Sequence, residues 1–200
     1  DLIQPYDLYS SMLSYSYVDL IIEEIQPISY FTCYESTYKQ YTCFKQFVYS
    51  TFCLDTIQNV SISQQLQSVF CKGIYPDMDD VDSEIKNTRQ TLETIRLYLS
   101  HLIDSKNESC VKINYERDDV YFYCTPTRAK KLKQNFQNRA NKPFYISMSH
   151  ESEKYKIDPL EITMKKKDSS SMILDWPWLR SKLSYLETKY KDLSKLNETY

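Results

Sequence analysis

Residues 33–71 read CYESTYKQYTCFKQFVYSTFCLDTIQNVSISQQLQSVFC and hold four of the six cysteines in the chain. Aromatic and aliphatic residues recur every three or four positions here, which predicts a helix over residues 30–57. The β-branched and aromatic content leaves a strand as the alternative. Because cysteines punctuate this element at regular intervals, their bonding decides how it joins the rest of the fold.

A continuous helix would keep Cys33, Cys43 and Cys53 apart from one another. Ten residues of helix rise about 15 Å, whereas the two Cα atoms of a disulfide lie within about 7 Å. Each of the three would then bond to a cysteine outside the helix, and the candidates are Cys71, Cys110 and Cys124. The expected fold is therefore one in which three disulfides staple this helix to its neighbours.

The cysteine spacing favours structural disulfides over a metal site. No two cysteines form a C-x-x-C motif, and zinc sites use pairs two to four residues apart. The alternative is a protein with buried free thiols in a reducing compartment. Three N-x-[ST] sequons favour the secretory pathway, because they accept surface glycans. Their asparagines are Asn59, Asn107 and Asn197. We expect a protein that is secreted or lies on the extracellular or lumenal face of a membrane.

The composition is that of a globular protein built mainly from helices. The chain has 200 residues, of which 42% are hydrophobic and 26% charged, enough to bury a sizeable core. Its formal net charge of −2 gives no preference for nucleic acid. A single glycine, Gly73, stands against nineteen tyrosines. Since tight turns often need glycine, few tight hairpins are expected.

Apolar spacing of three and four residues predicts five further helices. They cover residues 5–25, 59–72, 82–105, 127–141 and 175–200. Residues 111–115 and 120–124 alternate like strands around a turn at 116–119, which predicts a hairpin. Residues 144–150 and 156–166 are expected to add short strands. The acidic residues 75–84 are expected to form a solvated turn.

The predicted fold class is mainly α (α+β). It is a disulfide-stapled helical bundle with a small antiparallel sheet or hairpin around residues 111–164 and a C-terminal heptad helix. We expect residues 1–168 to form the disulfide-bonded domain, with serines 169–171 as a linker. Residues 169–200 would then form a separate C-terminal helix, which could continue into a stalk or a membrane anchor.

Two cysteine pairs could also bond locally. Cys53 and Cys71 would meet if the chain turns back after the first of them. Cys110 and Cys124 flank the predicted hairpin, where a three-residue loop would set them on one face and a two- or four-residue loop on opposite faces. For this second pair we favour bonds back to the helix at 30–57 over a local bridge.

The sequence gives little support to an enzyme. The two histidines, His101 and His150, stand in no recognisable catalytic motif. Asp77, Asp79 and Asp80 lack the glycine and closing glutamate of a calcium loop. We therefore expect no catalytic residue, no metal ligand and no cofactor.

Two segments are candidates for contact with a partner. A basic stretch could bind an anionic lipid, a sulfated glycan or an acidic protein, although a solvated helix face is the favoured interpretation. A tryptophan pair flanking Pro177 would anchor a partner if exposed and plug the core if buried. These candidates are Arg128, Lys130, Lys131, Lys133, Arg139, Trp176 and Trp178.

These features indicate a non-enzymatic ectodomain that works by protein–protein contact, as in adhesion, receptor engagement or membrane fusion. The expected partner is a protein, such as a cell-surface or membrane protein, and not nucleic acid. The alternative is a secreted helical carrier of a lipid or small apolar ligand. An exposed aromatic patch would favour the first function, and an enclosed apolar pocket the second.

Overall fold

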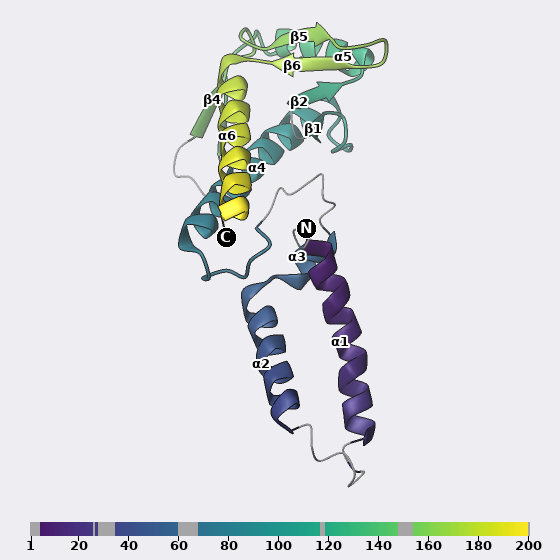
Figure 1. The fold of residues 1–200 in the computed structure, drawn as a ribbon. Helices are drawn as coiled ribbons and strands as arrows, with labels where there is room; N and C mark the ends of the chain where they lie inside the picture. Colours follow the sequence, from purple (N-terminus) through teal and green to yellow (C-terminus); the bar gives the residue numbers. More distant parts are fainter. Residues whose placement is uncertain are drawn as a thin grey trace. The chain divides into compact units, whose positions relative to one another are not determined.

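The computed structural model describes residues 5–25, 27, 35–59, 68–116, 119–147 and 154–199. This part of the chain is a mostly helical α+β structure with six helices, a four-stranded antiparallel sheet and a two-stranded hairpin (Figure 1). It divides into two compact units. Residues 1–82 with 193–200 make the first unit, and residues 83–192 make the second. The helical class with a small antiparallel sheet is confirmed.

The first unit contains a pair of antiparallel helices, α1 (Pro5–Ile25) and α2 (Glu35–Thr51), followed by the short α3 (Leu54–Asn59) (Figure 1). Helix α1 has the predicted bounds. The continuous helix predicted over 30–57 is wrong, because α2 ends at Thr51. Cys33 lies outside the described residues, and so does most of the helix predicted over 59–72.

A contact between distant residues ends α2. Phe52 pairs with Phe70 in an antiparallel bridge, and their rings lie 5.2 Å apart. Two backbone hydrogen bonds flank the bridge, from the Cys53 N–H to the Val69 carbonyl (2.9 Å) and from the Cys71 N–H to the Thr51 carbonyl (2.8 Å). The chain therefore leaves the helix just before Cys53, so the three evenly spaced cysteines are not on one helix.

Helix α4 (Pro76–Ile103) begins within the acidic stretch that was expected to be a turn. Pro76 suits a first helical position, and Asp77 and Asp79 lie in the first turn, where the helix dipole favours negative charge. The predicted apolar side of α4 is buried, as the exposed fractions of 0–1% show for Ile85, Leu92, Ile95 and Leu99.

The strands of the second unit pair only antiparallel. Their bounds are Lys112–Glu116 (β1), Asp119–Cys124 (β2), Phe144–Ser147 (β3), Lys154–Ile157 (β4), Thr163–Lys166 (β5) and Met172–Asp175 (β6). The sheet order is β1-β2-β6-β5, and β3 pairs with β4 separately. Glu116 pairs with Asp119, so the β1–β2 loop has two residues. Serines 169–171 lie in the connection between β5 and β6.

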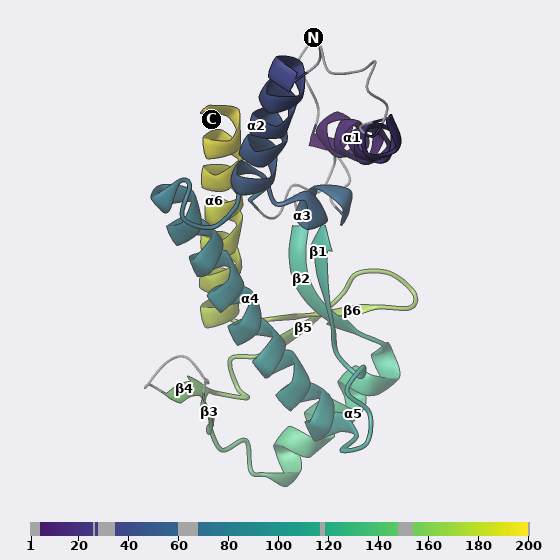
Figure 2. The same cartoon turned by 90° about the horizontal axis from the view of Figure 1, so that it is seen from below.

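The second unit also contains α5 (Pro126–Asn138) and most of α4 and α6 (Pro177–Thr199), in addition to the sheet (Figure 2). The α6 side chains Leu179, Leu183 and Leu186 are buried in the core of the second unit, as the heptad pattern predicts. Trp176, at the start of α6, packs edge-on against Phe122 of β2 with the rings 5.9 Å apart.

The cysteines are the main departure from the predicted fold. The five in the described part of the chain are free thiols: Cys43, Cys53, Cys71, Cys110 and Cys124. The described fold is therefore held together without the three staples that the spacing predicted. Its cohesion comes instead from the apolar core of the helices and sheet.

Candidate functional site: an exposed apolar stripe on α1

Helix α1 packs one side against α2. On this side the Tyr15 ring meets the rings of Tyr41 and Phe44 edge-on at 5.6 and 5.9 Å. Met12, three residues before Tyr15, is buried, and α1 also contacts α3. These contacts fix which face of α1 is covered within the first unit.

A polar cluster reinforces the same side. The Tyr41 hydroxyl lies 2.7 Å from the Tyr15 carbonyl oxygen and 2.9 Å from Asp19 Oδ1, and it donates to both. Lys45 forms an ion pair with Asp19. The Lys45 ammonium lowers the pKa of the Asp19 carboxyl, whereas burial, aided by Asp19, raises the pKa of Tyr41 to about 12. Both groups therefore keep this pairing at neutral pH, and α1 is held in one rotation about its axis.

The opposite side of α1 exposes five large apolar side chains, with exposed fractions of 49–68%. They recur at i, i+7, i+11, i+14 and i+15, which places them within one face of a helix. We call this face the α1 stripe, and its members are Tyr6, Leu13, Tyr17, Leu20 and Ile21. From Tyr6 to Ile21 it extends about 22 Å along the helix.

The α1 stripe is the kind of surface that a second molecule covers. A helix that is apolar on all sides is normally buried, and large contiguous apolar patches on a soluble protein mark interaction sites. Fully burying a Leu, Ile or aromatic side chain contributes about 1.5–3 kcal/mol, so covering half-exposed ones contributes roughly half as much each. On α2, Phe44 and Phe47 are also exposed.

The charges on α1 are all acidic. It carries four carboxylates and no lysine or arginine: Asp7, Asp19, Glu23 and Glu24. In the described residues, no helix has the length and apolar character required to cross a bilayer. Helices that lie on an anionic membrane surface carry lysine and arginine on their polar face, a feature that α1 lacks.

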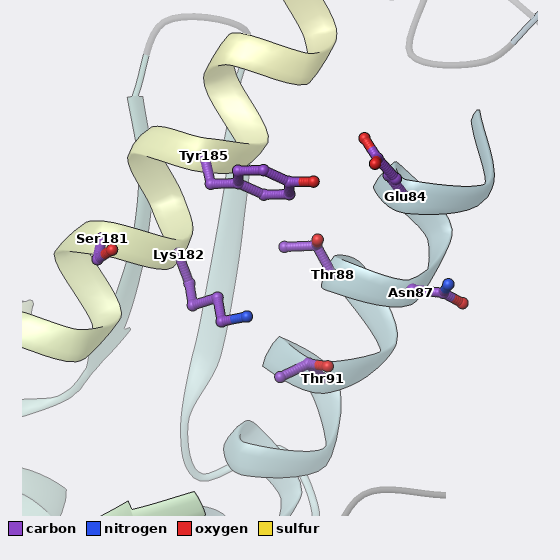
Figure 3. A pocket seen from close by; sticks show the side chains of 7 residues that line it. All are labelled: Glu84, Asn87, Thr88, Thr91, Ser181, Lys182 and Tyr185. Atoms are coloured by element: carbon purple, nitrogen blue, oxygen red, sulfur yellow. The ribbon is translucent and has the colours of Figure 1, made fainter. Parts of the chain in front are cut away.

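A polar pocket lies between α4 and α6 in the second unit. It has a volume of about 280 Å³ and is lined mainly by hydroxyl, amide and charged side chains. Figure 3 shows Tyr185 and Lys182 pointing from α6 toward Thr88 and Thr91 of α4. It is open to solvent and does not resemble the enclosed apolar cavity of a lipid carrier.

Three ionisable groups at or beside this pocket, Glu84, Tyr185 and Lys189, have shifted pKa values. Glu84 forms an ion pair with Lys189, which lowers the pKa of the Glu84 carboxyl. The same pair raises the pKa of Lys189, and burial raises the pKa of Tyr185. Each shift moves the group away from neutrality, whereas a general acid or base needs a pKa near the working pH. The pocket has space for a small polar molecule.

The predicted site residues are dispersed over the described structure. Within α5, Arg128 is half-buried and donates to the Ser109 carbonyl (3.1 Å), whereas Lys130, Lys131 and Lys133 are exposed. Arg139, exposed, is the C-cap of this helix.

The tryptophan pair is not a free docking anchor. Trp176 is buried and Trp178 half-buried, and Trp178 lies edge-on to Tyr155 with ring centroids 4.9 Å apart. The burial of Trp176 matches the interpretation of a core plug.

The three sequons occupy different environments. Asn59 is the last residue of α3. Asn107 is half-buried, and its side-chain oxygen accepts the Ser109 N–H at 2.9 Å. The side-chain amide atoms of Asn197 are buried on α6.

The cysteines lie in two pairs and one exposed position. Cys43 is exposed on α2, Cys53 and Cys71 flank the Phe52–Phe70 bridge, and Cys110 and Cys124 are buried in the second unit. Among the described residues, no group of histidine, cysteine or acidic side chains could hold a metal ion.

Comparisons with protein-family models, curated proteins and solved structures find no match to this chain. The site must therefore be interpreted from its own residues. Sequence reasoning placed α1 correctly but did not identify the α1 stripe. The sequence does carry a signal for this stripe. Apolar residues occur on every side of α1, which is more than a helix with a single packed face needs.

Proposed function

We propose that this protein is a non-enzymatic ectodomain that acts by protein–protein contact through the α1 stripe. The observation that carries the proposal is a row of five large apolar side chains on the side of α1 facing away from α2. The partner is a protein whose apolar surface is rimmed by basic residues, which would complement the acidic side chains of α1.

A protein partner is favoured over a lipid for two reasons. First, α1 has no basic residue to attract an anionic membrane. Second, the described pockets between α4 and α6 and beside α5 are open to solvent, whereas a carrier needs an enclosed apolar cavity. The sequons and the even cysteine count support a place in the secretory pathway, either secreted or on the outer or lumenal face of a membrane.

The test compares three proteins in affinity capture from native membranes. They are the wild type, the double variant Leu13→Gln with Ile21→Gln, and a control, Leu160→Gln. Leu160 is 74% exposed in the second unit, so the control introduces the same chemistry elsewhere. All three substituted positions are exposed, and unfolding curves should be unchanged within about 0.5 kcal/mol.

The supporting result is a protein that wild type and control retain and the double variant loses. After purification, that protein should bind the double variant at least tenfold more weakly, since losing about 2 kcal/mol of apolar burial reduces affinity about 30-fold. Equal binding to all three proteins would refute the role of the stripe. Co-purified lipid without a protein would favour the carrier function instead.

We also propose that α5 supplies a secondary contact for sulfate or phosphate groups, from a sulfated glycan or an anionic lipid. Its three exposed lysines lie on a helix with no acidic residue. The triple variant Lys130→Gln, Lys131→Gln, Lys133→Gln should elute from heparin at a lower salt concentration than wild type. Elution of both proteins at the same salt concentration would show that this face is merely solvated.

A further inference from the structure

We infer that the chain forms two local disulfides under oxidising conditions, Cys110–Cys124 and Cys53–Cys71, each within one compact unit. The pairing rests on the proposed extracytoplasmic location for its occurrence in the native protein. It replaces the long-range staples that the spacing predicted. Both members of each pair belong to the same unit.

Cys110 lies two residues before the start of β1, and Cys124 is the last residue of β2. Both are buried, with exposed fractions of 2% and 3%, and both line one cavity of about 240 Å³ in the second unit. Burial is the main cause that raises the pKa of the Cys124 thiol to about 11, and Cys110 adds to the shift. This influence of one thiol on the other is consistent with their shared place at the cavity.

The strand register alone would have kept this pair apart. Lys112 pairs with Tyr123, so a regular continuation would set Cys110 opposite Thr125 and on the other face from Cys124. Two features turn the chain instead. The Ser100 hydroxyl accepts the Val111 N–H at 2.9 Å, which holds the chain just before β1.

The second feature is the cap of α5. The Thr125 side chain accepts the Arg128 N–H, so the chain enters a helix directly after Cys124. Arg128 also donates to the Ser109 carbonyl at 3.1 Å, which ties the start of α5 to the residue before Cys110. The two cysteines are thereby held beside the same cavity.

The Phe52–Phe70 bridge brings the second pair together independently. Since the rings of Phe52 and Phe70 share one face of the bridge, the residues next to them point to the other face. Cys53 and Cys71 are diagonal neighbours on that face, where Cα atoms lie about 7–8 Å apart in a regular ladder. A disulfide between them therefore requires the two strands to approach slightly, to within about 7 Å. Burial, and then Cys53, raise the pKa of the Cys71 thiol, in agreement with a short separation.

Each bond forms by thiol–disulfide exchange with a small-molecule disulfide such as oxidised glutathione. The two cysteine thiols lose two protons and two electrons and gain one S–S bond. The small-molecule disulfide accepts them and leaves as two thiols. The raised pKa values of Cys71 and Cys124 keep these two thiols protonated at neutral pH, so exchange at them should be slow in the folded protein and efficient during oxidative refolding.

Tryptic mapping tests the pairing on the full chain. Reduced, denatured protein is refolded with oxidised and reduced glutathione, quenched with acid, and then alkylated with a maleimide in denaturant, so that buried free thiols also react, before digestion. We expect peptide 107–112 joined to peptide 118–128, which reports Cys110–Cys124. Peptide 46–72 contains both Cys53 and Cys71, and it should appear unalkylated and two hydrogen atoms lighter.

Other linkages would overturn the proposal. These are a bond from either pair to peptide 40–45, which carries Cys43, or a bond between the two pairs. Full alkylation after refolding would also overturn it. As a control, in the Cys110→Ser variant Cys124 should be alkylated, while peptide 46–72 should still contain the Cys53–Cys71 disulfide.

The same map of native protein separates this inference from the proposed function. Free thiols in the native protein, with the predicted bonds after refolding, would contradict the extracytoplasmic location and support the pairing. Different bonds in both samples would contradict the pairing alone.

Discussion

Replacing Ser100 with alanine should destabilise the second unit measurably. Ser100 and Val111 are both fully buried, and the Ser100 hydroxyl is the acceptor for the Val111 N–H at 2.9 Å. The Val111 carbonyl keeps a second partner in the variant, because Arg96 donates to it at 3.1 Å. The carbonyl would lose only its longer bond from the Ser100 hydroxyl (3.4 Å), whereas the N–H would be left without its acceptor.

The expected loss follows from two opposing effects. A buried N–H without an acceptor costs about 1–3 kcal/mol. Alanine is a better helix former than serine by about 0.5 kcal/mol, and Ser100 lies in α4. We therefore expect Ser100→Ala to lower the free energy of unfolding by about 0.5–2.5 kcal/mol.

Urea unfolding of reduced protein measures this loss, and Ser181→Ala is the matched control. Ser181 is an exposed residue of α6, so its replacement should change stability only by the helix preference. An equally stable or more stable Ser100→Ala protein would refute the role of this hydroxyl in holding residues 110–111. In that case the position of Cys110 would need another explanation.

Three further outcomes are expected. Tyr41→Phe removes a hydrogen bond to the Asp19 carboxylate and should lower the unfolding free energy by about 1–3 kcal/mol, whereas Tyr38→Phe, at an exposed position, should not. The folded state lowers the pKa of Asp19 below 3.8. The contribution of Asp19 to the free energy of unfolding is therefore complete above about pH 5 and should be lost as the pH falls through the lowered pKa. Acid titration of the Asp19→Asn variant should lack this loss. Leu186→Ala opens a cavity in the core and should cost about 2–5 kcal/mol, while Leu160→Ala should leave the denaturation midpoint unchanged.

Local signals predicted the isolated helices well. The bounds of α1 follow from Pro5 and Pro27, which set its start and end. The buried side of α4 follows from its apolar period of three and four residues. Its early start was missed, although Pro76 before several aspartates is a helix-start pattern.

Contacts between distant residues explain what the sequence could not predict. The apolar period of α2 continues to Phe52, but pairing with Phe70 ends the helix first. A two-residue hairpin loop predicts opposite faces for Cys110 and Cys124. Two hydrogen bonds change the course of the chain next to these cysteines: the Val111 N–H donates to Ser100, and Arg128 donates to the Ser109 carbonyl. No local pattern encodes either contact.

The candidate site was missed for a related reason. Tyrosine and aliphatic residues occur on every side of α1, so its period does not identify which face is packed. Tyr41 and Lys45 of α2 make that choice by binding Asp19. The exposed face is thus a consequence of contacts with residues that lie 22 and 26 positions further along the chain than Asp19.

Photo-crosslinking from the α1 stripe tests the central claim most directly. A photoreactive phenylalanine analogue would replace Tyr17, which is 68% exposed, and Leu160 in a control protein. On native membranes, the Tyr17 probe should label a protein that the Leu160 probe does not, and Leu13→Gln with Ile21→Gln should reduce the label at least tenfold. Labelling of lipid alone from Tyr17, or the same proteins from both positions, would contradict a protein-binding role for α1.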